Sequence, residues 1–443
     1  MKKFLSAIIA TVMIFACMCC AVGCKKDLYS AYKKEIESEM KGSFDFFWNE
    51  VSLNETVAEG NLPTYGLIAD RYPNKSFNAS VASVGFGLTA YVIGVEEGWV
   101  TREEAQTRSL KTLQTMVALQ NAPDVSYEGF LAHFINMNTG KRVSNVEISS
   151  VDTAILLCGA VAAGEYFGGE VKALADELYG NVNWKAIERV RGGKTYLTMG
   201  YSQESQKLLG DWDWYAEQLM MYVLGAGSPV EEHRLDDTAY YDFARNEGAY
   251  NGHKFIYSWF GSIFTYQFSH AWIDFSGKKD NNGTDWHQNS VEASKAAYDF
   301  CRDRRDEYVT FAKGGWGLTA CDTPDGYSGH LGAMPRGWQS DAAYPRIAAT
   351  VAPCGAIGSV VFTPEESLKA LKYYGTLRLL NGKYGLADAY NLDREWFASD
   401  CIGIDKGISL LMLSNYKDRT VWDTVMKNQN ILLGLENLGF TAA

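Results

Sequence analysis

Apolar residues recur at helical spacing in segment after segment of this chain, and few segments alternate with the period of two that is typical of a half-buried strand. The first such segment covers about 25–50, with Tyr32, Ile36 and Met40 on one side. Further helices are predicted near 80–97, 101–117, 150–162, 168–180, 184–191, 212–225, 288–307, 364–375, 403–414 and 419–437. This succession predicts an all-α fold.

Two helix starts carry a capping box, in which a Thr and a Glu three residues later satisfy each other's backbone groups. They are Thr101 with Glu104 and Thr363 with Glu366, the latter with a Pro at the first helical position. In the helix near 80–97 the small residues Ala82, Gly85 and Gly87 predict close packing against a neighbouring helix.

Long irregular stretches separate some of these helices, at 51–78, 122–148, 248–287 and 313–362. Loops of this length in a compact domain are usually functional. No Pro- or Ser-rich linker divides the chain, so residues 40–443 are expected to form a single catalytic domain. Paired helices with long loops at one end favour an (α/α)6 barrel, or toroid, in which the loops form a cleft.

The N-terminus carries an export pattern. Lys2 and Lys3 precede an apolar stretch from Phe4 to Val22, which small residues and Cys24 follow. This pattern predicts a lipoprotein signal peptide over 1–23, lipidation of Cys24, and an anchor segment with the start of the first helix over 24–39. A plain signal peptide or a membrane anchor is the alternative. We expect a protein of the cell envelope, periplasmic or at the cell surface, that touches the membrane through its lipid only.

Composition excludes some partners. A net charge of −12 makes nucleic acid an unlikely partner, because phosphate contact needs a basic surface. The cysteines after the leader are widely spaced, so we expect buried thiols and no metal site. Aromatic residues make up 13% of the chain, which suits either sugar-binding faces or a large helical core.

No phosphate loop, dinucleotide fingerprint, metalloprotease motif or nucleophile elbow is present in the sequence, so we expect no cofactor. What remains is a set of acidic residues beside aromatic ones. Glycoside hydrolysis needs such a set. One protonated acid donates its proton to the leaving oxygen, and one carboxylate either activates a water molecule or attacks the sugar. Glu217 follows two Trp and a Tyr and precedes an apolar run, so its pKa should rise toward a range useful for a general acid. A first-turn Glu that stabilises a helix is the alternative.

Asp405 stands between glycines at the start of an apolar helix, where it could face a cavity or cap the helix. Asp152 opens another apolar helix and has the same two interpretations. The other candidates are possible substrate contacts, each with an internal salt bridge or packing role as its alternative: Asp70, Arg71, Trp212, Asp213, His270, Trp272, Asp274, Trp316, Asp322 and Asp388. Spacing alone predicts a cleft enzyme or a carbohydrate binder.

Five blocks resemble the bacterial glycoamylase-like domain, which includes glycoside hydrolases of β-1,2-glucans. The blocks are 83–88, 151–154, Ser-His-Ala-Trp-Ile-Asp-Phe at 269–275, Trp-Gly-Leu-Thr-Ala-Cys-Asp at 316–322, and 403–405, and the likeness runs from about residue 40 to the C-terminus.

The resemblance implies an (α/α)6 barrel, no metal, and inverting hydrolysis of β-1,2-glucan, either internally or with release of sophorose from chain ends. It also implies Glu217 as general acid, Asp405 on the base side and Asp152 as a further acid of the cleft. Ala216 and Lys406 depart from the family pattern, and a cation beside Asp405 should lower the pKa of that carboxyl.

Two other functions stay open. The chain could hydrolyse another glucan, as a glucoamylase or β-glucosidase does, or it could be a surface lipoprotein that captures glycans without cleaving them. In each case the partner is a glucan oligo- or polysaccharide, and we expect a monomer.

Overall fold

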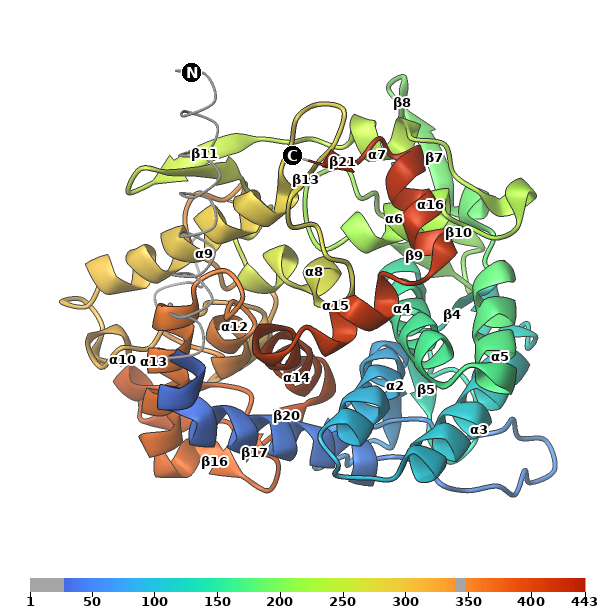
Figure 1. Ribbon diagram of the computed structural model, residues 1–443, viewed down its shortest axis with the longest axis horizontal. Coiled ribbons are helices and arrows are strands. Elements are labelled where there is room, and N and C mark those ends of the chain that lie inside the picture. Colours follow the sequence, from blue (N-terminus) through green and yellow to red (C-terminus); the bar gives the residue numbers. More distant parts are fainter. Residues whose placement is uncertain (1–27, 339–347, 443) are drawn as a thin grey trace, which may run out of the picture.

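The computed structural model of the chain describes residues 28–338 and 348–442. The predicted leader 1–23, the lipidation site Cys24 and the first residues of the anchor segment lie outside this part. Within it the fold is mainly helical, as predicted (Figure 1).

One group of helices is buried along most of its length: α2 (Val81–Glu96), α4 (Ser150–Phe167), α6 (Leu219–Ala226), α12 (Pro353–Ile357) and α14 (Gly403–Lys417). They are neighbours in the order α12, α14, α2, α4, α6. A second group lies outside the first: a helix over 28–49, α3 (Arg102–Gln120), α5 (Gly169–Gly180), α9 (Trp286–Asp303), α13 (Pro364–Thr376) and α16 (Gln429–Asn437). Shorter helices complete the set: α7 (Thr238–Asp242), α8 (Phe268–Trp272), α10 (Val309–Ala312) and α15 (Thr420–Val425).

The helices α2 and α4 cross with their backbones in contact, which confirms the close packing predicted from the small residues of α2. A Cβ atom placed on Gly159 would lie 1.9 Å from the carbonyl oxygen of Gly85. No side chain fits there, so both positions require glycine. The contact holds the two core helices at a fixed distance from each other.

Short antiparallel hairpins and bridges occupy the stretches between helices, and sequence periodicity did not predict them. The two that matter for the site are β1 (Arg71–Tyr72) with β20 (Cys401–Ile402), and β14 (Cys321–Thr323) with β15 (Gly326–Ser328). The remaining strands are β2 (Asn78–Ser80), β3 (Ser126–Tyr127), β4 (Phe130–Leu131), β5 (Phe134–Asn136), β6 (Ile148–Ser149), β7 (Glu188–Arg191), β8 (Lys194–Leu197), β9 (Gly200–Ser202), β10 (Lys207–Leu209), β11 (Glu247–Tyr250), β12 (His253–Ile256), β13 (Lys278–Lys279), β16 (Asn381–Gly382), β17 (Gly385–Leu386), β18 (Tyr390–Asn391), β19 (Trp396–Phe397) and β21 (Thr441–Ala442).

Four predictions about local structure were wrong. The segment near 419–437 forms two helices, α15 and α16, and not one. The segment near 184–191 is a single turn of 3₁₀ helix followed by strand β7, because its residues pair with β8. The helix expected from 212 begins only at Leu219, since residues 212–217 run as an extended segment into it. Thr363 makes no capping bond, although Pro364 does open α13, whereas the capping box of Thr101 and Glu104 is present at α3.

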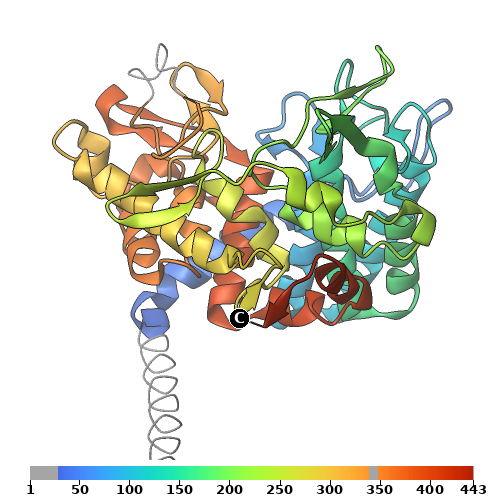
Figure 2. The ribbon, with the colours of Figure 1, turned by 90° about the horizontal axis from the view of Figure 1, so that it is seen from above.

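Several of the long loops lie at one end of the molecule. Figure 2 shows the green hairpins near 190–210 and the orange segment near 320–330 opposite the dark red C-terminal helix. The helix α4 is long and apolar enough to cross a membrane, but 83% of it is buried inside the fold, so it is a core helix. The five cysteines in the described residues are all buried and free.

Candidate active site

Glu217 lies at the end of the extended segment 211–217, immediately before α6. Ser269 fixes this point of the chain, because its hydroxyl donates to the Glu217 carbonyl (2.7 Å) and accepts from the Met220 amide (3.0 Å). Burial raises the pKa of the half-buried Glu217 carboxyl to about 7; the negative charge of Asp152 adds to this rise, and a backbone hydrogen bond opposes it. The group is therefore placed to hold a proton near neutral pH.

The Glu217 carboxyl faces a cavity of about 740 Å³, a size typical of small-molecule sites. Its walls include the indole rings of Trp212, Trp214 and Trp259, and the ring of Trp259 is 41% exposed. Trp214 packs edge to face against Trp259 with ring centroids 5.0 Å apart. Flat aromatic faces of this kind suit the C–H faces of sugar rings.

Asp152 stands in the first turn of α4, whose N-cap is Ser149, so the helix-start prediction for this residue is confirmed. Ser149 Oγ donates to the Asp152 carboxylate at 2.5 Å, and His133 Nε2 lies 3.7 Å from it. Burial alone would lower the pKa of His133, but the charges of Asp152 and Glu147 outweigh it and raise the pKa to about 9. The charged imidazolium of His133 thus faces Asp152, and no sequence pattern had singled out His133.

Asp70 and Arg71 enter the site through the pairing of β1 with β20, which places Arg71 opposite Ile402 just before α14. The Arg71 guanidinium contacts three carboxylates: Nε lies 3.2 Å from Asp70, and Nη1 lies 3.0 Å from Asp322 and 3.3 Å from Asp400. Burial raises the pKa of Asp70, while the charge of Arg71 opposes this rise. Arg71 therefore ties the start of α14 to the β14–β15 hairpin.

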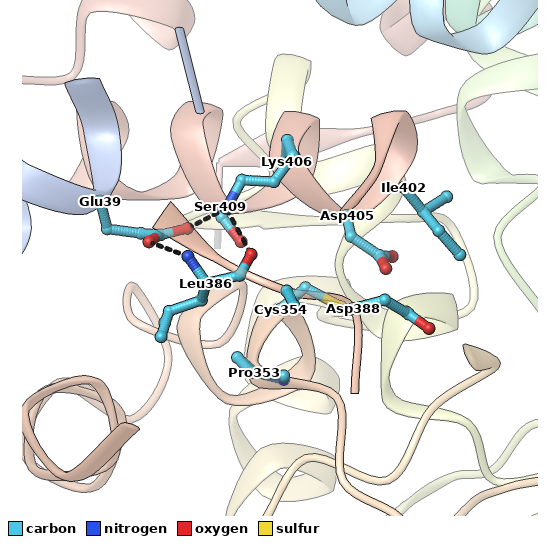
Figure 3. Close-up of a pocket in the computed structure, with 10 residues that line it drawn as sticks. Glu39, Pro353, Cys354, Leu386, Asp388, Ile402, Asp405, Lys406 and Ser409 are labelled. Atoms are coloured by element: carbon cyan, nitrogen blue, oxygen red, sulfur yellow. Dashed lines mark hydrogen bonds and ion pairs between the residues drawn. The ribbon is translucent and has the colours of Figure 1, made fainter. Parts of the chain in front are cut away.

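Asp405 occupies the first turn of α14, and it does not cap the helix, because the N-cap position is Ile402. Its carboxyl lies beside that of Asp388, and both are almost fully buried (Figure 3). The Asp322 amide donates to Asp388 Oδ2 at 2.7 Å. Burial is the largest cause that raises the pKa of each carboxyl, and the contact between the two groups raises the pKa of Asp388 and lowers that of Asp405.

Tyr327 connects the two acidic groups. It lines the cavity of Glu217 and pairs across the β14–β15 hairpin with Asp322. Although 57% of the residue is exposed, burial around its hydroxyl and the charges of Asp405 and Asp388 raise the pKa of the phenol. The cavity and the buried pair are thus neighbours at the loop-bearing end of the fold.

The contacts of Lys406 differ from those expected of a cation beside Asp405. Its ammonium group donates to Glu39 on the helix over 28–49 and to the Leu386 carbonyl oxygen at 2.9 Å, so it points away from Asp405. The charge of Lys406 still opposes the rise in the pKa of Asp405, but burial dominates and the pKa is raised. The predicted lowering by the cation is present, but burial outweighs it, so the net pKa of Asp405 is raised.

Four predicted substrate contacts lie in the core and do not line the cavity. Trp272 is fully buried with its indole N–H bonded to Thr89 (2.8 Å), and Trp316 is 1% exposed. His270 bonds to Ser290 (3.0 Å), and burial lowers its pKa to about 3. Asp274 pairs with Arg419 at 2.7 Å. We assign these four side chains to packing and internal pairing.

The remaining candidates lie at the site. Trp212 and Asp213 line the cavity; the indole of Trp212 donates to Ser150 Oγ (3.2 Å), and Asp213 pairs with Arg191. Sequence reasoning missed Trp259, Tyr327, His133 and Asp400, since none of them lies within a predicted helix. Among the described residues no group of three or more His, Cys, Asp or Glu side chains is arranged to hold a metal ion.

The mainly helical fold is similar to that of solved glucoamylase-family structures. Residues 210–429 match the Glycoamylase family, described as "Putative glucoamylase". The chain resembles a "putative glucoamylase" from Bacteroides uniformis (TM-score 0.80, 26% identity, 93% of this chain and 98% of that one). It also resembles the endo-β-1,2-glucanase of Chitinophaga pinensis in complex with sophorotriose and glucose (TM-score 0.78, 24% identity, the same shares of the two chains).

A curated relative is the exo β-1,2-glucooligosaccharide sophorohydrolase (non-reducing end) of Parabacteroides distasonis. It is 26% identical over 452 residues, which cover 91% of this chain. The chain spans 57% of the length of that relative. These comparisons confirm the resemblance seen in the sequence: the chain is related to the Glycoamylase family, and two of the similar proteins are named as enzymes of β-1,2-glucans.

Proposed function

We propose that this protein is a glycoside hydrolase that cleaves β-1,2-linked glucan chains with inversion at the anomeric carbon. The observation that carries the proposal is Glu217, a carboxyl with a pKa near 7 that faces a cavity walled by Trp212, Trp214 and Trp259. A general acid needs a pKa close to the working pH, and partial exclusion of water supplies it here. The names of the relatives support β-1,2-glucan as the substrate class.

In this mechanism Glu217 gives its proton to the glycosidic oxygen as the bond from that oxygen to the anomeric carbon breaks. A water molecule attacks the opposite face of the same carbon, and its proton passes to Asp405, the carboxylate of the base side. The net reaction adds one water and yields two shorter sugars. The Asp152 carboxylate helps keep Glu217 protonated before the step, because a nearby negative charge disfavours ionisation.

The alternation of inner and outer helices supports an (α/α)6 barrel over residues 40–443 as the single catalytic domain. The contacts from α12 through α14, α2 and α4 to α6 support five helices as inner helices of such a barrel, and α13, α3, α5 and α16 lie outside them. In this arrangement the loops at one end form the cleft, with Glu217 and Asp405 at the starts of α6 and α14.

The pattern of Lys2, Lys3, the apolar run and Cys24 supports a lipid anchor that holds the enzyme in the cell envelope. The full chain made in a bacterial host is expected to enter the detergent phase on Triton X-114 partition, and Cys24→Ala is expected to leave it in the aqueous phase. A parent chain found wholly in the aqueous phase would contradict the anchor.

Activity is tested on the chain without its leader, residues 25–443. The protein is incubated with linear β-1,2-glucan and, in parallel, with starch, β-1,3-glucan and β-1,4-glucan, and the products are separated by chromatography. Sophorose alone at early times means exo action, and a ladder of oligomers means endo action. Cleavage of another glucan in place of β-1,2-glucan would overturn the substrate assignment, and binding without cleavage would make the protein a glycan-capture lipoprotein.

A further inference from the structure

The buried pair of Asp388 and Asp405 has more oxygen atoms than the described residues can satisfy. Asp388 Oδ2 accepts from the Asp322 amide, whereas Asp388 Oδ1 and Asp405 Oδ2 are buried without a donor from any other side chain or backbone group in the described part of the chain. Figure 3 shows both carboxyl groups directed to the same side, away from Lys406 and Glu39. Each side chain is at most 8% exposed.

Two carboxylates in such a place cannot both be ionised, because each charge raises the energy of the other where little water screens it. A proton between them removes the repulsion and supplies the missing donor. The pair then resembles two acids that share one proton and titrate as a unit.

The surroundings decide which carboxyl holds the proton. The groups that face the pair are Asp322 and Tyr327 from the β14–β15 hairpin, Cys321 from β14, Cys354 from α12 and Lys406 from α14. Lys406 and the Cys354 thiol favour the ionised form of Asp405. The Asp322 amide favours that of Asp388, but the charge of Asp322 opposes ionisation of both carboxyls, and the pKa of Asp388 is raised well above its ordinary value. The carboxyl of Asp388 is thus the weaker acid.

We propose that Asp388 carries the shared proton in the resting protein and donates it in a hydrogen bond to Asp405, so that Asp388 is a positioning residue for the base. The proposal rests on the proposed function for the role of Asp405. With one oxygen held by the Asp322 amide, Asp388 has a fixed orientation. It keeps Asp405 ionised and turned in one direction, and its own proton is not consumed in the reaction.

The first test needs no substrate, so it stands apart from the proposed function. Infrared spectra of the purified protein at pH 7 are recorded in a Glu217→Gln background, which removes one further carboxyl whose pKa lies near this pH. We expect the absorption of a protonated carboxyl group, and we expect Asp388→Asn to abolish it. A spectrum without that absorption, or one in which it survives Asp388→Asn, would overturn the proposal.

The second test compares an amide with a truncation at the same position. Asn keeps an N–H donor for Asp405 and an oxygen for the Asp322 amide, whereas Ala removes both. On β-1,2-glucan, Asp388→Asn should keep kcat within about tenfold of the parent, and Asp388→Ala should lose about a hundredfold or more in kcat with little change in KM. Asp405→Asn serves as the inactive reference.

Thermal unfolding of each variant shows whether it is folded. An Asp388→Asn enzyme as inactive as Asp405→Asn, or an Asp388→Ala enzyme as active as the parent, would contradict the positioning role. The pH profile adds a readout that packing alone would not move: the acid limb of kcat/KM should shift to higher pH in Asp388→Ala, because Asp405 loses the donor that favours its ionised form.

Discussion

The ammonium group of Lys406 is bonded to the carboxylate of Glu39, and the two side chains are only 4% and 5% exposed. The Glu39 carboxylate also accepts from the Leu386 amide at 3.1 Å, and Lys406 donates to the Leu386 carbonyl oxygen. This pair joins the helix over 28–49 to α14, the helix that carries Asp405. The first helix of the described chain is therefore bonded to the helix that carries Asp405, the residue on the base side of the site.

Removing one partner of this pair should be costly, because the other charge stays buried without a counter-ion. We expect Glu39→Gln and Lys406→Met each to lower the free energy of unfolding by about 3–5 kcal/mol, as measured by denaturant unfolding. The double variant should recover part of the loss. The exposed pair of Glu365 with Lys369 is the matched control, where Glu365→Gln should change stability by less than about 1 kcal/mol. Equal effects at the two sites would contradict the interpretation.

The pH dependence of the rate should carry the signature of Glu217. Activity requires its protonated form, so kcat/KM should fall as the pH rises through about 7. On the acid side, activity should fall when Asp405 gains a proton, at a pH above the ordinary range of an aspartate. A rate that stays constant from pH 6 to 9 would exclude Glu217 as the acid.

Glu217 should also reduce the stability of the protein at alkaline pH. Its pKa is raised in the folded state, so folding is favoured while the proton is bound and loses that advantage as the pH rises from about 4.5 to about 7. Glu217→Gln should therefore stabilise the protein above pH 7 by at most about 3 kcal/mol and have little effect at pH 4. Thermal unfolding of both proteins across this range measures the difference. A Gln variant that is less stable at pH 8 would show that the ionised group is favourably bonded.

Replacing His133 should have the opposite effect on stability from replacing Glu217. Its folded-state pKa of about 9 lies above its ordinary value, so its contribution to stability is complete below pH 6.5 and is lost as the pH rises through 9. His133→Gln is expected to destabilise the protein at pH 6 and to matter much less at pH 10. The same variant should shift the pH dependence of kcat, since the cation that faces Asp152 is gone. A loss of stability independent of pH would indicate packing alone.

Trp259 should contribute to substrate binding. It is 41% exposed and lines the cavity, so its removal costs little core packing. We expect Trp259→Ala to lower kcat/KM by about tenfold, which corresponds to the energy of a good aromatic contact, and to leave the melting temperature nearly unchanged. Leu379→Ala, at a side chain 72% exposed and not among the cavity residues, is the control. Equal kinetics for both variants would remove Trp259 from the binding surface.

The sequence predicted the long helices well, because the pattern that defines a helix lies within a few turns of it. Asp152 was correctly placed at a helix start for the same reason. The hairpins were not predicted, because their pairing depends on residues far apart: Arg71 of β1 lies opposite Ile402 of β20. The clustering of Arg71 with Asp322 and Asp400 follows from that pairing, so no local pattern shows it.

The sequence motifs led to a wrong role for His270, Trp272 and Trp316. A motif indicates which residue type is required at a position, but it does not indicate whether the side chain packs in the core or contacts a ligand. All three rings are buried and bonded within the fold. Trp259, which no motif singled out, lies on the cavity wall. Burial distinguishes the two sets, and burial follows from long-range packing that a single sequence does not reveal.

The measurement that tests the central claim most directly follows the anomeric configuration of the product by NMR while the parent enzyme cleaves linear β-1,2-glucan, with Glu217→Gln in parallel. The account predicts that the α-anomer forms first from the β-linked chain and that Glu217→Gln slows the reaction by about a hundredfold or more. Initial release of the β-anomer, or a Glu217→Gln enzyme as fast as the parent, would contradict it.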